Sequence, residues 1–159
     1  MGVTGAGKTT VGKLLARELG WRFLDADSFH SASNIAKMTH GIPLTDCDRQ
    51  PWLESIHTAL LDCARKNQNA VLACSALKQS YRDLLAAGVD LKVCFLKGAP
   101  DEIRAHLNTR KGHFAGDSIL AGQFADLEEP RDAVVLPVGQ APETNVREAL
   151  RTLGLAAST

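Results

Sequence analysis

Residues 2–9, with the sequence Gly-Val-Thr-Gly-Ala-Gly-Lys-Thr, match the pattern G-x-x-x-x-G-K-[ST] of loops that hold phosphate groups. Glycine lets such a loop turn its backbone N–H groups toward an anion, because it adopts positive φ and has no Cβ to obstruct the ligand. Lys8 would supply a positive charge to the β- and γ-phosphates, and the Thr9 hydroxyl is placed to ligate Mg²⁺. The residues assigned to the nucleotide are Gly2, Thr4, Gly5, Ala6, Gly7, Lys8, Thr9 and Thr10. A glycine-rich turn with a chance Lys-Thr is disfavoured, because an amphipathic helix follows at once.

A pair of carboxylates, Asp25 and Asp27, follows the next predicted strand. Because side chains alternate along an extended segment, we expect the two to point the same way. Two like charges side by side are unfavourable unless a metal or a donor lies between them. One could hold Mg²⁺, and the other could accept a proton from an attacking hydroxyl, as phosphoryl transfer requires. The alternative is a solvated turn in which Asp27 or Ser28 caps a helix.

Basic residues follow in two further polar segments. Arg49 follows Asp46 and Asp48 in a polar loop that enters a helix, and it could bind a carboxylate or phosphate at two points. Helix capping by Asp46 or Asp48, with no ligand, is an equal alternative. Lys78 and Arg82 are four residues apart, so a helix would bring both to one face at its N-terminal end, where they would form an anion receptor. Ordinary surface charge is the alternative there.

A third basic segment covers residues 110–114 and has no regular pattern. Arg110 and His113 flank Gly112, which suits a mobile lid over about residues 110–117 that excludes water and brings a cation to the transferring phosphoryl group. Arg110 is the better candidate for that role, because its guanidinium is always charged and fork-shaped. A plain exposed loop is the alternative.

The bulk composition limits the function classes. At 159 residues the chain has the length of one domain, and we expect a single domain over residues 1–159. Lys plus Arg balance Asp plus Glu at 18 each, so no overall field attracts nucleic acid or an anionic membrane. No apolar run approaches the roughly 18 residues of a membrane span. The four cysteines are scattered, which argues against zinc and disulfides and favours a cytoplasmic setting.

The elements that must position these residues alternate between helical and strand patterns, which predicts an α/β fold with a mainly parallel sheet. The polar motifs fall at the carboxyl ends of strands, where ligands collect in such sheets. Pro51 is expected in the first turn of its helix. The predicted helices cover residues 8–19, 28–38, 51–66, 78–86, 100–109, 118–127 and 143–153, and the predicted strands cover residues 22–24, 70–74, 91–96 and 133–138.

Only Met1 precedes the phosphate loop, although such loops normally follow a buried strand. Loss of a central strand would expose apolar faces and unpaired backbone groups on both neighbours. We therefore expect that the usual first strand is missing from this sequence and that the natural product begins upstream.

Taken together, the motifs resemble the gluconokinases of the small phosphate-loop type, in the wider group that includes shikimate kinase. The phosphate loop alone is generic, whereas the ordered set of blocks is highly specific. The blocks that carry the resemblance are residues 1–10, 23–30, 34–38, 41–46, 48–53, 74–83, 110–114 and 123–128. The link over residues 130–132 is shorter than is usual in the family, which leaves the adenine contacts open.

The resemblance implies an ATP- and Mg²⁺-dependent kinase that phosphorylates the terminal hydroxyl of D-gluconate to give 6-phosphogluconate. It also implies a five-stranded parallel sheet between helices and a cytoplasmic homodimer. A kinase for another hydroxy acid such as shikimate, or a nucleotide-binding protein without turnover, remains an alternative. By position, the implied catalytic residues are Lys8, Asp27 and Arg110, the metal residues are Thr9 and Asp25, and the acceptor residues are Asp27, His30, Arg49, Lys78, Arg82 and His113.

Overall fold

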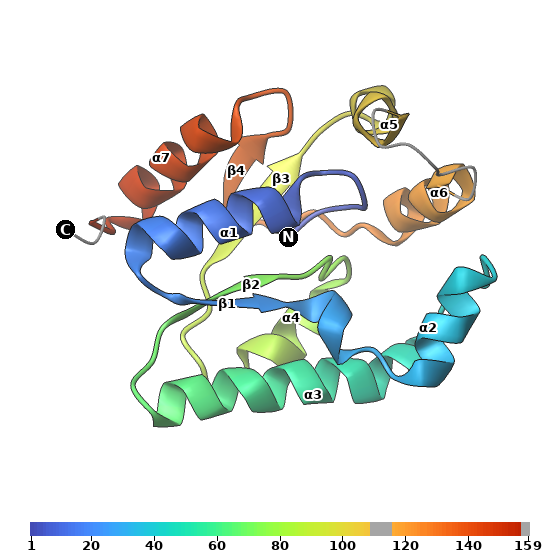
Figure 1. Ribbon diagram of the computed structural model, residues 1–159, viewed down its shortest axis with the longest axis horizontal. Helices are drawn as coiled ribbons and strands as arrows, with labels where there is room; N and C mark the ends of the chain where they lie inside the picture. Colours follow the sequence, from blue (N-terminus) through green and yellow to red (C-terminus); the bar gives the residue numbers. More distant parts are fainter. Residues whose placement is uncertain (109–115, 157–159) are drawn as a thin grey trace.

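Helices and strands alternate along the chain, which confirms the α/β class expected from the sequence. The computed structural model describes residues 1–108 and 116–156 (Figure 1). None of the helices in these ranges is long and apolar enough to cross a membrane. In chain order the elements are α1 (Lys8–Leu19), β1 (Arg22–Asp25), the 3-10 helix η1 (Ala26–Phe29), α2 (Ala32–Thr39), α3 (Asp46–Arg65), β2 (Ala70–Ala73), α4 (Gln79–Ala86), β3 (Val93–Lys97), α5 (Pro100–Asn108), α6 (Gly116–Asp126), β4 (Ala133–Pro137) and α7 (Pro142–Leu153).

The strands form two parallel pairs. β1 pairs with β2, with Leu24 opposite Leu72, and β3 pairs with β4, with Phe95 opposite Val135. Parallel strands need a helical crossover between them, and α3 supplies the connection from β1 to β2. The parallel arrangement predicted from the alternating pattern is confirmed.

The first two residues of the chain lie between the two strand pairs. Gly2 N donates a hydrogen bond to Ser75 O at 3.3 Å, just beyond β2, and Leu96 N in β3 donates to Met1 O at 3.0 Å. Within the described residues, the five-stranded sheet that the resemblance implies is thus represented by β1 to β4 with residues 1–2 at its centre. The phosphate loop leaves from this central position.

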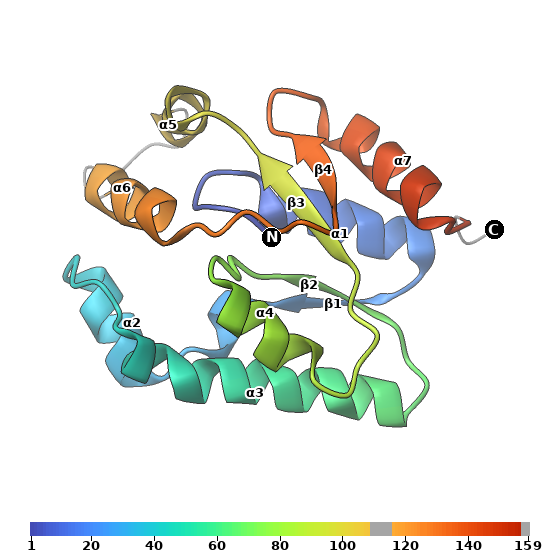
Figure 2. The ribbon, with the colours of Figure 1, turned by 180° about the vertical axis from the view of Figure 1, so that it is seen from behind.

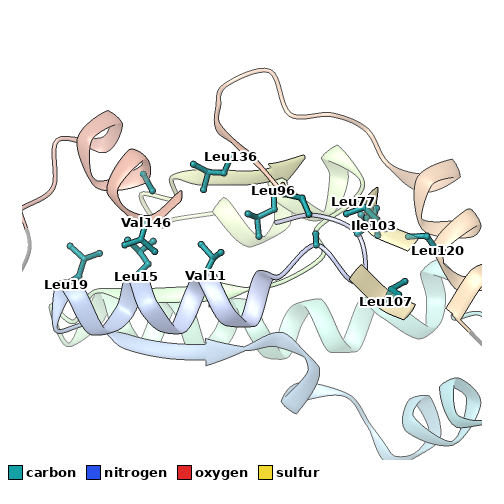
Figure 3. Packing of buried hydrophobic residues seen from close by; sticks show 14 residues of the cluster. Val11, Leu15, Leu19, Leu77, Leu96, Ile103, Leu107, Leu120, Leu136 and Val146 are labelled. Atoms are coloured by element: carbon teal, nitrogen blue, oxygen red, sulfur yellow. The ribbon is translucent and has the colours of Figure 1, made fainter. Parts of the chain in front are cut away.

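Two buried clusters lie on either side of this centre. β1 and β2 lie between α1 on one side and α3 on the other, and α7 packs along β4 (Figures 1 and 2). The first cluster joins Val11 and Leu15 of α1 to Leu136 of β4 and Val146 of α7 (Figure 3). The second cluster gathers buried side chains of α3 and α4 under β1. The carboxyl end of β1 and the phosphate loop lie at one end of the molecule, which α2, α5 and α6 surround (Figure 1).

Two predicted helix boundaries are wrong, each because one polar side chain begins the helix elsewhere. α3 begins at Asp46, so Pro51 lies inside the helix and not in its first turn. Thr45 Oγ1 accepts a hydrogen bond from Asp48 N, and Asp48 Oδ2 accepts one from Thr45 N, which forms a capping box. The single helix expected over residues 28–38 is instead η1 and α2, because Ser31 caps α2 with its side chain.

Candidate active site

The phosphate loop turns into α1 at Gly7, which has a φ of 86°. This left-handed conformation is open to glycine and unfavourable for other residues. No side chain among the described residues caps the N-terminus of α1, so its first N–H groups are left for an anion. Lys8 Nζ donates to Val3 O at 2.8 Å, which holds the ammonium group against the loop. The loop therefore has the geometry of an anion site at a helix N-terminus.

Close packing on α5 supports the shape of the loop. Gly5 has a φ of 80°, and a Cβ at this position would lie 2.7 Å from the side chain of Leu107. Ala6 is buried on the other side of the turn. Glycine at position 5 is thus required both by the backbone conformation and by the space available.

A hydroxyl and a carboxylate meet beside the loop. Thr9 Oγ1 donates to Asp25 Oδ2 at 3.4 Å, and Asp27 N donates to Asp25 Oδ1 at 3.2 Å. We expected Asp25 and Asp27 to point the same way from one extended segment. That segment is not extended, because β1 ends at Asp25 and Asp27 belongs to η1. Asp25 caps that turn, so its carboxylate both faces Thr9 and fixes the segment that carries the exposed Asp27.

The oxygen donors of Thr9 and Asp25 fit Mg²⁺, which binds hard oxygen ligands. Among the residues that the structure describes, no group of three or more His, Cys, Asp or Glu side chains could hold a metal. Mg²⁺ typically takes one or two protein ligands and completes its shell with water and substrate phosphates. The arrangement is therefore that of a nucleotide-dependent Mg²⁺ site rather than an all-protein cage.

His30 stacks on Trp52, with ring centroids 4.6 Å apart and an interplanar angle of 5°. Trp52 Nε1 donates to Ala26 O at 2.7 Å, which fixes the indole under the turn that carries Asp27. Burial lowers the pKa of His30, although the charge of Asp27 acts in the opposite direction, so the imidazole is neutral at pH 7. Its Nδ1 is buried without a hydrogen-bond partner among the described residues, so one polar atom of the ring is unsatisfied.

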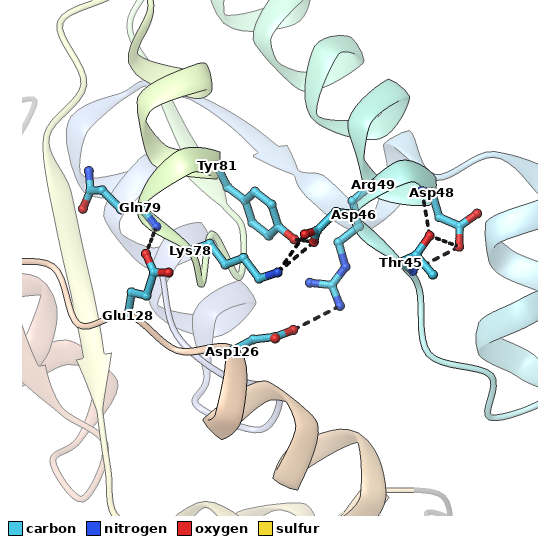
Figure 4. A network of polar contacts seen from close by, with 9 residues as sticks. All are labelled: Thr45, Asp46, Asp48, Arg49, Lys78, Gln79, Tyr81, Asp126 and Glu128. Carbon is cyan, nitrogen blue, oxygen red and sulfur yellow. Dashed lines mark hydrogen bonds and ion pairs between the residues drawn. The ribbon is translucent and has the colours of Figure 1, made fainter.

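A second group of cations, Lys78 and Arg49, lies apart from Lys8, where the N-termini of α3 and α4 meet (Figure 4). Lys78 Nζ lies 2.9 Å from both carboxylate oxygens of Asp46. Tyr81 donates its hydroxyl proton to the same carboxylate. Arg49 lies over the Tyr81 ring at 5.8 Å, and its Nη2 is 3.8 Å from Asp126 Oδ2.

These contacts set the charges of the cluster. Hydrogen bonds from Tyr81 and then Lys78 lower the pKa of Asp46, and the Asp46 carboxylate raises the pKa of Lys78. Burial and the bond to Asp46 raise the pKa of Tyr81. At pH 7 the cluster therefore holds an ionised Asp46, a charged Lys78 and a neutral phenol, with the guanidinium of Arg49 beside them.

Arg82 is placed apart from Lys78. Lys78 is the N-cap of α4 and not a helical residue, so the two do not share a helix face as we expected. Arg82 is only 5% exposed, and its guanidinium donates to Ala76 O and Leu77 O, each at 2.9 Å. These contacts fix the turn between β2 and α4, which is the turn that presents Lys78.

Residues 109–115 lie outside the described residues, and they include Arg110, His113 and most of the predicted lid. Their assignment to the transferring phosphoryl group and to the acceptor remains a prediction.

A cavity of about 410 Å³ adjoins the phosphate loop on the side of α7. The loop after β4 lines it, together with His106 of α5 and Asn145 of α7. Asn145 is buried, and its Nδ2 donates to Pro137 O at 3.0 Å. Sequence reasoning assigned no function to this loop, although its place at the carboxyl end of a parallel strand was a usable signal.

Sequence reasoning also missed the roles of four polar or aromatic residues, because each acts through a partner remote in sequence. They are Trp52, Tyr81, Gln123 and Asp126.

A glycine loop that opens a helix, a hydroxyl–carboxylate pair beside it and a cationic cluster for a second anion define a phosphate-loop kinase. The comparisons with known proteins agree. The shikimate kinase family profile matches residues 4–134. A probable gluconokinase of Mus musculus is 47% identical over 82% of this chain and 80% of its own length. The thermoresistant gluconokinase of Escherichia coli is 40% identical over 96% of this chain and 90% of its own.

Solved structures give the same result. The crystal structure of a gluconokinase from Sinorhizobium meliloti matches with a TM-score of 0.87 and 42% identity, over 97% of this chain and 89% of that one. The chain belongs to the gluconokinase family, within the shikimate kinase-like group.

Proposed function

We propose that this protein transfers the γ-phosphoryl group of ATP to the terminal hydroxyl of D-gluconate, which gives 6-phosphogluconate and ADP. The observation that carries the proposal is the hydrogen-bonded chain from Thr9 through Asp25 to the backbone of Asp27. It joins the phosphate loop to a turn that presents an exposed carboxylate. Gluconokinases of 40–47% identity support gluconate as the acceptor.

On the nucleotide side, the N–H groups of residues 4–9 and the ammonium group of Lys8 would bind the β- and γ-phosphates. The cavity beside α7 would receive the base and the ribose. Thr9 and Asp25 would hold Mg²⁺, which supplies charge neutralisation to the phosphates when bound.

On the acceptor side, Asp27 would accept the proton of the attacking hydroxyl as the new P–O bond forms and the bond to ADP breaks. The neutral His30 would bind a hydroxyl group of the polyol. Arg49 and Lys78 would meet the carboxylate of the acceptor, because a planar guanidinium and an ammonium group together suit an anion.

Three further parts of the proposal come from the family resemblance. They are a lid that carries Arg110 and His113, a homodimer and a cytoplasmic location. The balanced charge of the chain, with 18 basic and 18 acidic residues, supports a small-molecule substrate rather than nucleic acid. Light scattering at several concentrations tests the dimer.

An acceptor screen tests the proposed reaction. ADP release is followed with ATP, Mg²⁺ and either D-gluconate, shikimate or no acceptor, and the product is identified by ³¹P NMR. We expect turnover with D-gluconate and formation of 6-phosphogluconate. Turnover only with another hydroxy acid, or nucleotide binding without turnover, would refute the proposal.

A further inference from the structure

The last two turns of α6 contact both halves of the site. Gln123 Oε1 accepts a hydrogen bond from Thr4 N of the phosphate loop at 2.5 Å. Asp126 Oδ2 lies 3.8 Å from Nη2 of Arg49, which belongs with Lys78 to the group of cations proposed to bind the acceptor. The two residues are three apart, so they lie on neighbouring positions of one helix face. One short rigid segment therefore connects the nucleotide loop with the acceptor cation.

Asp126 lies at an unfavourable position for its own helix. It is the last residue of α6, where the carbonyl end carries partial negative charge, and the last turn of α6 holds no basic residue. A carboxylate is therefore repelled there by the helix that carries it. The guanidinium of Arg49, which is 17% exposed, offsets this repulsion. The Asp126 carboxylate is thus stabilised by Arg49 and not by the end of α6.

The two carboxylates that face the acceptor cations differ in how firmly they are held. Asp46 accepts hydrogen bonds from both Lys78 and Tyr81, so it is a fixed part of the cluster. Asp126 makes one long ion pair, at 3.8 Å from Arg49, and its charge also acts on Lys78. Arg49 keeps its place without Asp126, because its guanidinium also lies over the Tyr81 ring. Asp126 is therefore the carboxylate that an incoming anion can replace.

We propose that the Asp126 carboxylate pairs with Arg49 at the position that the carboxylate of the acceptor would take. When Asp126 is released from Arg49, α6 transmits the change to the phosphate loop through Gln123. This inference rests on the proposed function, because it takes a carboxylate as the acceptor's anionic group. When the carboxylate of the acceptor binds Arg49, Asp126 loses its ion-pair partner and the end of α6 moves away. The contact of Gln123 with Thr4 then loosens, and the Thr4 amide becomes available to the nucleotide.

The proposal makes the two substrates bind cooperatively. The acceptor must compete with Asp126 for Arg49, and the nucleotide must compete with Gln123 for the amide of Thr4. Because both competitors sit on one helix, displacement of one favours displacement of the other. Each substrate should therefore raise the affinity for the other by the same factor.

The test measures the KM for gluconate, and by calorimetry the Kd of a non-hydrolysable ATP analogue with and without gluconate, in the wild type and in Asp126→Asn. We expect the KM for gluconate to fall roughly two- to fivefold in the variant, as loss of an exposed ion pair allows. In the wild type, gluconate should tighten analogue binding by about fivefold or more. In Asp126→Asn this factor should fall below about twofold.

Gln123→Ala is the second variant and Asp62→Asn the control. Gln123→Ala should tighten analogue binding without gluconate and also bring the coupling factor below about twofold. Asp62 pairs with Arg65 on the exposed face of α3, so its variant changes the charge equally without touching the site. It should leave the KM and the coupling factor at the wild-type values.

The outcomes separate this inference from the proposed function. A wild type that turns over gluconate, with an unchanged or raised KM in Asp126→Asn or with wild-type coupling in both variants, would overturn the role of α6 alone. A wild type that fails to phosphorylate gluconate would overturn the proposed function, and the role of α6 with it.

Discussion

At the scale of single residues, the proposed acceptor side depends on the indole of Trp52. Its ring supports His30 by stacking, and its N–H binds the buried carbonyl of Ala26 at 2.7 Å. One side chain therefore orients the imidazole and fixes the turn that presents Asp27. Trp52 belongs to the apolar stripe of α3, so its periodicity indicated only a core residue.

Trp52→Phe should keep a ring beside His30 but leave the Ala26 carbonyl without its donor. We expect the free energy of unfolding to fall by about 1–3 kcal/mol, the usual cost of an unsatisfied buried acceptor. Urea unfolding measures this change. Trp21→Phe is the matched control, because the Trp21 side chain makes no hydrogen bond within the described residues, and its effect should be smaller. Equal losses in the two variants would contradict the role of the hydrogen bond.

At the scale of elements, capping side chains decide where the functional helices begin. Thr45 and Asp48 start α3 ahead of Pro51, and this early start brings Asp46 and Arg49 to the acceptor cluster. Lys37 of α2 donates to Asp48 Oδ1 at 2.7 Å and so ties α2 to the same cap. The position of Arg49, one of the two cations proposed for the acceptor, is therefore set by a local capping box.

The cap should make stability depend on pH. Hydrogen bonds from Lys37 and then from Thr45 lower the pKa of Asp48 from 3.8 to about 2. A group with a depressed folded-state pKa stabilises the fold above its unfolded pKa, and this contribution is lost as the pH falls from about 4 to about 2. Between pH 5 and pH 3, which includes the upper part of this interval, the free energy of unfolding should fall less in Lys37→Met than in the wild type. Urea unfolding at pH 5 and pH 3 compares them, and parallel pH profiles would exclude the linkage.

The phosphate loop offers a pair of glycines for comparison. Gly5 and Gly7 both have positive φ, of 80° and 86°, but a Cβ at Gly5 would overlap Leu107 whereas one at Gly7 would meet no described atom within 4 Å. Gly7→Ala should cost about 1–2 kcal/mol from the left-handed backbone alone. Gly5→Ala should cost about 1–3 kcal/mol more, because of overpacking against α5. Thermal unfolding ranks the two, and the reverse order would contradict this packing.

Local sequence patterns predicted which segments form helices and strands better than they predicted the residues at which these begin and end. The periodicity of α1 and the apolar run of β2 were sufficient, and both match the structure closely. The boundary errors at Thr45 and Ser31 arose because one hydrogen-bonding side chain outweighs propensity at a helix N-terminus. The phosphate loop was predictable because all of its parts lie within residues 2–9.

Much of the rest of the site was not predictable, because its contacts join segments that are remote in sequence. Gln123 and Thr4 are separated by 119 positions, and no local periodicity records such a pair. Asp126 lies within the helix predicted over residues 118–127, and no local pattern distinguishes it from other charged residues. The loop after β4 carries no motif, so only its place in the sheet indicates a role.

At the scale of the whole molecule, two buried clusters support two halves of one reaction. The phosphate loop packs on the first cluster through Val3, and the acceptor residues rest on the second through Trp52 and Tyr81. Leu77 belongs to the first cluster and Ala76 to the second, so the turn after β2 joins them. The two substrates would thus meet where the clusters meet, beside the carboxyl end of β1.

Asp27 lies at this junction, and the account makes it the group that receives the proton of the acceptor. A general base acts on the transition state and not on the bound nucleotide, so its loss should lower turnover far more than ATP affinity. Asp27→Asn preserves the shape of the side chain and removes its basicity. The backbone N–H of residue 27, which binds Asp25, is unaffected by the change.

The most direct test therefore measures kcat with D-gluconate and the Kd of ATP in Asp27→Asn and in the wild type. We expect kcat to fall by roughly 10²- to 10⁴-fold while the Kd of ATP stays within about twofold. Wild-type turnover in the variant, or a loss of ATP binding with unchanged turnover, would contradict the account.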